Sequence, residues 1–263
     1  MSRIATKFAA LGERKALVTF VTAGDPTLAH TVPAMHAMVA GGADILELGI
    51  PFSDPEAEGP SIQASSERAL ANNVSLKTVL DMVRSFREKD SDTPVVLMGY
   101  LNSILAMTDF AEQASSAGAD GLIMVNLPPE EAHTLKPDLA KNDIDLIFLI
   151  APTTTDARAT TILSQASGFA YYVSLKGITG ADHLDTDQVA TRLAKLRAES
   201  EVPVCVGFGI KDPETAKAVG AHADGVVVGS ALVNIMAEGE EPEACAERLR
   251  ESVQALRNGL DEV

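Results

Sequence analysis

Short runs of β-branched and other apolar residues recur along the chain, and in most of them the apolar positions are consecutive rather than alternating. Consecutive apolar positions are typical of strands that are buried on both faces of a parallel sheet. The pattern predicts eight strands, at residues 16–21, 44–48, 94–99, 120–125, 145–150, 169–174, 202–207 and 224–229.

The segments between these strands have helical periodicity. Residues 76–89 place their apolar side chains mostly on one side of a helix, and residues 186–199 repeat that pattern. Asp212 and Pro213 have the order of a helix start, with an aspartate as N-cap and a proline as the first helical residue. The chain therefore alternates between strands and helices.

Eight strands alternating with helices over about 250 residues predict a TIM (β/α)8 barrel. A doubly wound open sheet is the alternative, but no G-x-G-x-x-G follows the first strand. In residues 2–14, Ile4, Phe8 and Leu11 share one helical face, which predicts an extra N-terminal helix capping the bottom of the barrel. The absence of a low-complexity linker or composition break favours a single TIM-barrel domain, residues 1–263.

Charge and composition narrow the possible functions. The net charge of −16 disfavours non-specific nucleic-acid binding, which needs clustered lysine and arginine. The most apolar tract, from Gly225, is too short to span a membrane, and the first residues lack a secretory apolar core. Cys205 and Cys245 lie far apart and form no zinc or disulfide signature. We expect a soluble cytoplasmic protein that binds no metal, nucleic acid or membrane.

Three glycine-containing loops follow the last three predicted strands. They contain Gly180, Gly209, and Gly229 with Ser230. A phosphate often binds beyond strands seven and eight of a TIM barrel, where glycine lets backbone N–H groups approach an anion. Any one loop alone would indicate only a turn, whereas three adjacent loops favour a phosphate site. Lys176 is either a further phosphate contact or a solvated lysine.

Two acids and a tyrosine pair are the candidate chemical groups. Glu47 ends the second strand, where partial burial would favour its neutral form and suit a general acid or base; a glutamate paired with lysine or arginine is the alternative. Glu58, eleven residues later in a proline-bracketed loop, is either held in place or solvated. Strand alternation turns one of Tyr171 and Tyr172 into the barrel.

Five motifs carry a family resemblance. "LVTFVTAGDP", "LELGIPFSDPEAEGPSIQ", "YVSLKGITGA", "VGFGI" and "VVVGSALV" occur in this order over nearly the whole chain, which resembles the tryptophan synthase α chain family. The resemblance implies a TIM barrel that cleaves indole-3-glycerol phosphate to indole and glyceraldehyde 3-phosphate without a metal or cofactor of its own. It also implies a pyridoxal-phosphate β chain as partner, in an αββα tetramer that passes indole through a tunnel.

The resemblance also implies a role for each site residue. Glu47 falls on the glutamate that protonates the indole ring carbon and helps to remove the glycerol hydroxyl proton, so that the C–C bond breaks in a retro-aldol sense. Glu58 falls on the second acid, which steadies the indole N–H, and Tyr171 on the tyrosine late in strand six. The substrate-binding positions implied are Phe20, Ile62, Tyr100, Thr179, Gly180, Phe208, Gly209, Gly229 and Ser230.

The chain departs from the family pattern at five positions, of which Glu58, Glu56 and Asn126 are expected at the active site or the partner surface. Glu58 replaces the usual Asp, and its extra methylene moves the carboxylate by ~1.5 Å, a displacement that can cost about a hundredfold in rate. Glu56, Asn126, Ser103 and Thr19 are the others. The departures leave two alternatives: a weakly catalytic, phosphate-binding allosteric partner of a β chain, or a free-standing indole-producing lyase.

Overall fold

The computed structural model describes residues 2–174, 186–207 and 209–263. Its strand segments form one parallel sheet in the order β5-β4-β3-β2-β1-β9-β8-β7-β6. The segments are β1 (Ala16–Thr22), β2 (Ile45–Gly49), β3 (Val95–Gly99), β4 (Gly121–Met124), β5 (Asp145–Ile147), β6 (Leu149–Ile150), β7 (Ala170–Val173), β8 (Val204–Gly207) and β9 (Gly225–Val228).

One strand brings the two ends of this sheet together. The predicted strand at residues 145–150 is divided at Phe148 into β5 and β6. β5 pairs with β4, and β6 pairs with β7 on the other side, so that the sheet closes into a barrel. The eight predicted strands and the TIM-barrel fold are therefore confirmed, and the open-sheet alternative is wrong.

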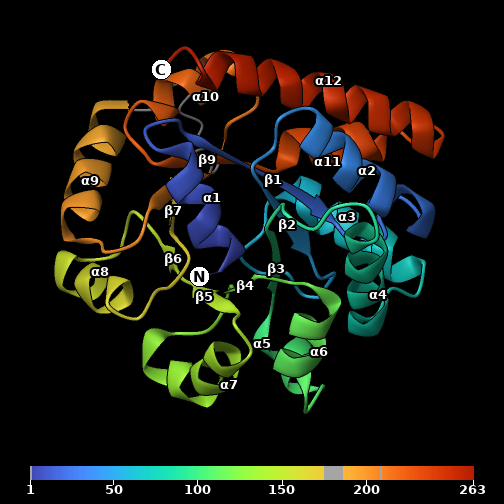
Figure 1. The fold of residues 1–263 in the computed structure, drawn as a ribbon, viewed down its shortest axis with the longest axis horizontal. Coiled ribbons are helices and arrows are strands. Elements are labelled where there is room, and N and C mark those ends of the chain that lie inside the picture. The colour runs from blue at the N-terminus through green and yellow to red at the C-terminus, as the bar shows by residue number, and fades with distance from the viewer. Residues whose placement is uncertain (1, 175–185, 208) are drawn as a thin grey trace.

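Helices surround the barrel (Figure 1). The two predicted at 76–89 and 186–199, and the helix start at Pro213, are confirmed; Asp212 Oδ1 accepts a hydrogen bond of 2.8 Å from the Thr215 N–H as an N-cap. The helices are α1 (Arg3–Leu11), α2 (Leu28–Ala40), α3 (Pro60–Ala71), α4 (Leu76–Arg87), α5 (Leu101–Leu105), α6 (Phe110–Ala117), the 3-10 helix η1 (Pro129–Thr134), α7 (Lys136–Lys141), α8 (Asp156–Leu163), α9 (Thr186–Glu199), α10 (Pro213–Gly220), α11 (Ser230–Ala237) and α12 (Pro242–Leu260).

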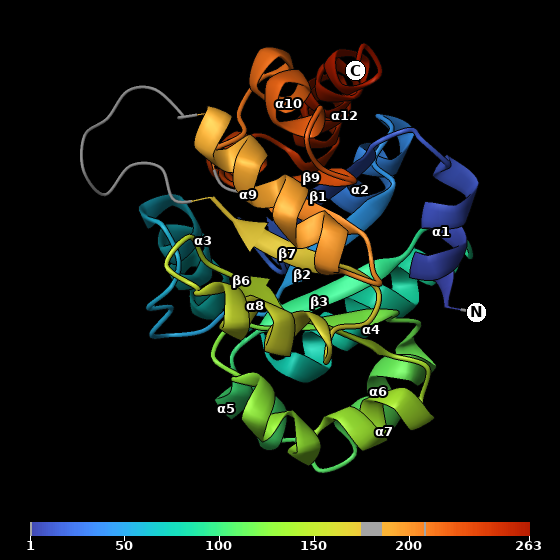
Figure 2. The same ribbon diagram turned by 90° about the vertical axis from the view of Figure 1, so that its left-hand side faces the viewer.

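The barrel interior has its own apolar core, which α1 covers. Ile4 of α1 is fully buried in the same cluster as Val18, Ile45 and other inward-facing strand residues. The Phe8 ring lies 6.1 Å from that of Phe169 between centroids. Figure 2 shows α1 at one end of the barrel and α3 toward the opposite end. The predicted N-terminal capping helix is thus confirmed.

Three aspartates join neighbouring strands at the amino end of the barrel. Each directly precedes a strand, and each carboxylate accepts a hydrogen bond from a backbone N–H near the start of the adjacent strand. The pairs are Asp44 with Leu17 at 2.9 Å, Asp120 with Val95 at 2.8 Å, and Asp224 with Val204 at 2.8 Å.

An arginine neutralises each of these buried or half-buried carboxylates. The shortest N–O distances are 3.0 Å for Arg257 and Asp44, 2.7 Å for Arg87 and Asp120, and 2.7 Å for Arg197 and Asp224. A carboxylate out of water is stable only when its lone pairs and its charge are matched, so each ion pair lets the aspartate hold two strands together. Within the described ranges, no helix combines the length and apolar character that a membrane crossing needs.

Candidate active site

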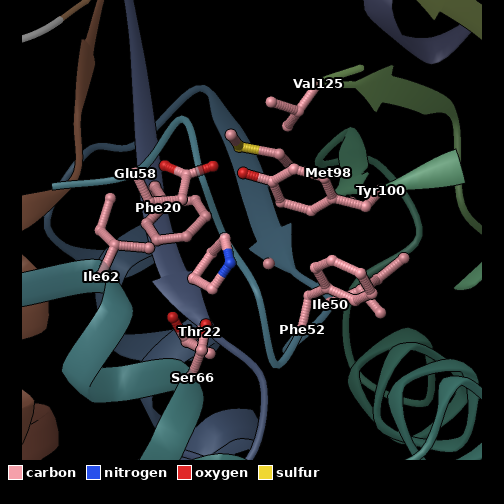
Figure 3. A pocket seen from close by; sticks show the side chains of 13 residues that line it. Phe20, Thr22, Ile50, Phe52, Glu58, Ile62, Ser66, Met98, Tyr100 and Val125 are labelled. Atoms are coloured by element: carbon pink, nitrogen blue, oxygen red, sulfur yellow. The ribbon is translucent and has the colours of Figure 1, made fainter. Parts of the chain in front are cut away.

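A cleft opens at the carboxyl ends of β1, β2 and β3, beside the loop that joins β2 to α3. It encloses about 290 Å³ of empty space, part of it open to solvent. Its wall is mostly apolar with a few polar groups, which is the usual character of a small-molecule site. The lining residues are Phe20, Thr22, Gly49, Ile50, Phe52, Pro55, Glu58, Ile62, Ser66, Met98, Gly99, Tyr100 and Val125 (Figure 3).

Four residues predicted for the site line this cleft: Phe20, Glu58, Ile62 and Tyr100. The sequence analysis did not predict the other lining residues. Met98 is an example that the sequence could have revealed, and Phe52 is an example that it could not. Met98 was detectable, because it follows the inward-facing Val96 by two positions in β3. Phe52 lies in a loop, where no periodicity marks which side chain turns inward.

Glu47 lies in an apolar setting beside the cleft. It is 2% exposed and pairs across the sheet with Phe20 of β1 and Val96 of β3. Burial, followed by repulsion from Glu58, raises the pKa of Glu47 to about 8, so that its carboxyl group is mostly protonated at neutral pH.

No lysine or arginine among the described residues forms an ion pair with Glu47, and its Oε2 has no hydrogen-bond partner there. The ion-paired alternative for Glu47 is therefore wrong for the part of the chain that the structure describes. Glu47 itself does not line the cleft, but Glu58 does, and the repulsion that Glu58 exerts on Glu47 means that the two acids are neighbours. Their proximity is what a two-acid site requires.

Glu58 is half-buried, and its loop holds it. The Glu58 N–H donates to the Pro55 carbonyl at 3.1 Å, and the Tyr100 hydroxyl group points toward the Glu58 carboxyl group. Burial raises the pKa of Glu58 to about 7, and the hydrogen bond from Tyr100 opposes that rise. The solvated-loop alternative fits the exposed Asp54 and Glu56 but is wrong for Glu58.

Tyr171 is the member of the tyrosine pair that faces the barrel interior. It packs against the inner core, whereas Tyr172 is buried in the layer between strands and helices. Burial, followed by repulsion from Glu47 and Glu58, raises the pKa of Tyr171 well above its usual value, so its phenol is neutral and lies close to both acids. Gly207 of β8 makes room for it, because a Cβ there would lie 2.3 Å from the Tyr171 hydroxyl oxygen.

The predicted phosphate loops are described only in part. Gly229 precedes α11, which begins at Ser230, and contributes no capping side chain to the helix start. A Cβ at Gly229 would lie 3.4 Å from the Phe20 ring, so this helix start borders the cleft without lining it. Gly209 has φ +80°, a left-handed conformation that favours glycine.

Four of the residues considered above, Lys176, Thr179, Gly180 and Phe208, lie outside the described residues.

The structure describes the contacts of three residues at which the chain departs from the family pattern. The Asn126 Oδ1 accepts from the Leu101 N–H at 2.9 Å, so its amide oxygen serves the start of α5 as a carboxylate would. The Ser103 N–H donates to the Tyr100 carbonyl at 3.1 Å, a bond that proline could not make. Thr19 is fully buried, and its hydroxyl group has no partner among the described residues.

Comparison with known proteins adds to this geometry. The sequence model described as "Tryptophan synthase alpha chain" matches residues 8–261. The chain belongs to the tryptophan synthase alpha chain family. It is 56% identical over 266 residues to the tryptophan synthase alpha chain of Thioalkalivibrio sulfidiphilus, covering 99% of this chain and 100% of that one. The alpha chain of Alkalilimnicola ehrlichii is 54% identical over 251 residues, 94% of this chain and 92% of that one.

Solved structures of alpha chains have the same fold. Tryptophan synthase subunit alpha from Legionella pneumophila strain Paris superposes with a TM-score of 0.91 at 43% identity, covering 100% of both chains. An aminoacrylate-bound tryptophan synthase from M. tuberculosis gives 0.87 at 32% identity, covering 99% of this chain and 100% of that one. The resemblance seen in the five motifs is therefore confirmed, and with it the tryptophan synthase alpha TIM barrel.

Proposed function

We propose that this chain cleaves indole-3-glycerol phosphate to indole and glyceraldehyde 3-phosphate, as a lyase of tryptophan biosynthesis. The observation that carries the proposal is Glu47: in a chain of this family, a buried carboxyl group with a pKa of about 8 lies beside an apolar cleft that suits an indole ring. A proton donor for a carbon atom needs a pKa near the working pH, and burial supplies it here.

In the proposed reaction, protonated Glu47 donates its proton to the indole carbon that carries the glycerol side chain. The ring becomes cationic, and its N–H is then more acidic and a stronger donor. Glu47, now a carboxylate, takes the proton from the adjacent hydroxyl group. The carbon–carbon bond breaks, its electron pair returns to the ring, and the hydroxyl carbon becomes the aldehyde. Glu47 ends protonated, as it began.

Glu58 and Tyr171 assist this step in our proposal. The Glu58 carboxylate accepts a hydrogen bond from the indole N–H and stabilises the positive charge that develops on the ring. This interaction is stronger in the transition state, where the ring is charged, than in the bound substrate. Tyr171, kept neutral beside both acids, keeps its proton and donates a hydrogen bond to the carboxylate that Glu47 becomes. Phe20, Ile62 and Tyr100 surround the ring as part of the cleft wall.

We propose that the phosphate binds at the start of α11. Gly229 and Ser230 leave the first N–H groups of that helix without a capping side chain, and the helix dipole favours an anion there. We propose that the backbone of Gly209, which has a left-handed conformation, is also part of this phosphate site. Thr179, Gly180 and Phe208 complete the proposed substrate site by family resemblance alone.

The protein partner is the tryptophan synthase β chain. We propose an αββα tetramer in the cytoplasm, and a single domain over residues 1–263. Every described strand belongs to one sheet, which supports a single domain. The exposed Glu56 on the cleft loop is available to a partner.

An indole-release assay with purified chain, alone and with a β chain titrated in, tests the function. We expect indole in both conditions and no turnover from Glu47→Gln, with the affinity for a phosphate ligand largely unchanged because binding uses other groups. Glu56→Gln, which neutralises an exposed acid on the cleft loop, is the matched control for the isolated chain. No indole from the wild-type chain in either condition would refute the proposal, as would wild-type turnover from Glu47→Gln.

The same assay separates the two alternatives. High turnover by the isolated chain, unchanged by the β chain, would favour a free-standing indole producer. A large gain from Glu58→Asp would favour a weakly catalytic site, whereas we expect a loss because the longer side chain places its carboxyl group toward the Tyr100 hydroxyl.

A further inference from the structure

Tyr100 connects two loops of the cleft. It follows β3 directly and is 4% exposed. Its ring stacks on Phe52, from the loop after β2, with 4.8 Å between centroids and 18° between planes. A stacked and buried ring has little freedom to rotate, so its hydroxyl oxygen has a defined position at the edge of the cleft.

The Tyr100 hydroxyl group meets the loop that carries the second acid. Its oxygen accepts a hydrogen bond of 3.1 Å from the Ala57 N–H. A hydroxyl group that accepts in this way keeps its own proton for another acceptor. The hydroxyl points toward the carboxyl group of Glu58 in Figure 3, and it lowers the pKa of that group.

We propose that Tyr100 is a positioning residue, whose hydroxyl group fixes the carboxyl group of Glu58 and the backbone beside it in one arrangement. A glutamate has one more rotatable bond than an aspartate, so its carboxyl group needs an additional restraint to stay in one place. The hydroxyl supplies that restraint, and the Ala57 bond keeps the loop from moving away with its acid. The inference deepens the proposed function, because it rests on Glu58 acting on the substrate.

The titratable groups around Glu58 determine which interactions a measured Glu58 pKa reflects. The titratable groups that face it among the described residues are Glu47 from β2, Tyr171 from β7 and Tyr100 itself; Glu56 is the neighbouring acid on its own loop. None of these is a cation. The Tyr100 hydroxyl therefore favours the ionised form of Glu58, while burial opposes it.

The test is Tyr100→Phe, which keeps the stacked ring and removes the hydroxyl group. Hydrogen bonds to charged groups are worth enough to predict a fall of about 10- to 100-fold in kcat/KM for indole release. The acidic limb of the kcat/KM pH profile moves to higher pH, because Glu58 loses a bond that favours its ionised form. Tyr172→Phe, at a buried tyrosine in the outer layer, is the matched control and leaves both unchanged.

A double-mutant cycle separates positioning from general disruption. If Tyr100 acts through Glu58, Tyr100→Phe costs little further activity in a Glu58→Gln background. An equal fold-loss in both backgrounds would overturn the proposal. Should Tyr100→Phe fail to fold, as judged by its thermal unfolding, Phe52→Leu replaces it: loss of the stacking partner moves the acidic limb in the same direction, and an unmoved limb argues against the proposal.

A carbon-13 NMR titration of the Glu58 carboxyl group, without substrate, keeps this inference independent of the lyase assay. We expect the Glu58 pKa to rise in Tyr100→Phe and to stay unchanged in Tyr172→Phe. An unchanged pKa in both would overturn the inference even if indole is released. A raised pKa in a chain that releases no indole would support the positioning role and refute the proposed function.

Discussion

The pH dependence of stability gives a direct test of Glu47. The substitution is Glu47→Gln, which keeps the shape of the side chain and removes its ionisation. The pKa of Glu47 rises from an ordinary 4.5 to about 8 in the folded chain. Between these two values the folded chain holds a proton that the unfolded chain has released, so the free energy of unfolding of the wild type falls as pH rises through this window.

The size of this effect follows from the pKa difference. A difference of 3.5 between 8 and 4.5 corresponds to about 5 kcal/mol at 1.36 kcal/mol per unit. Structural relaxation around the charge reduces this value, so we expect about 2 to 5 kcal/mol. Groups that do not interact with Glu47 titrate alike in both proteins, so the difference between variant and wild type reports Glu47 and its coupling to Glu58 and Tyr171. That difference grows in favour of the variant as pH rises.

Urea unfolding followed by circular dichroism, from about pH 5 to about pH 9, measures this difference. The glutamine amide adds a buried N–H group without a partner, which costs about 1 to 3 kcal/mol at every pH and displaces the curve without changing its slope. Glu56→Gln is the control, because this exposed acid has no reason to alter the slope. A constant difference between Glu47→Gln and wild type would mean that Glu47 is ionised in the fold, and our acid assignment would then be wrong.

Three further predictions concern stability and the site. Asp120→Asn removes the charge opposite Arg87, and we expect the free energy of unfolding, measured in urea, to fall by ~3 kcal/mol. Thr19→Val removes a buried hydroxyl group without a partner and raises the free energy of unfolding by ~1 kcal/mol. Gly207→Ala puts a methyl group where the Tyr171 hydroxyl lies; the phenol must move, and kcat/KM for indole release falls by at least about tenfold.

Each of these has a control or a contrary outcome. Asp92→Asn, at an exposed acid near the same arginine, should change stability by less than about 0.5 kcal/mol. A less stable Thr19→Val variant would show that the hydroxyl group has a partner after all. For Gly207→Ala, thermal unfolding is measured alongside activity, and full activity in a folded variant would place the phenol elsewhere.

The barrel was predictable because each strand is an unbroken apolar run between turn residues. The division at Phe148 was not, since "DLIFLI" contains no glycine or proline and the break arises from closure of the sheet. Glu47 was recognisable from its position in a strand. The restraint on Glu58 was not, because its donor, Tyr100, lies 42 residues away by number and meets it only across two folded loops.

The divided strand also gives the two reactive groups unequal mechanical support. Glu47 lies in the middle of β2, which is paired along its length with β1 and β3. Tyr171 lies at the join: β7 is paired along its length with β8 on one side, whereas on the other side the short β6 pairs only Leu149 and Ile150 with it in the part of the chain that the structure describes. Local opening of the barrel is therefore expected to start at the short β6, next to Tyr171, before it reaches Glu47 in β2. We expect the amides of β6 to take up deuterium before the amides of β2.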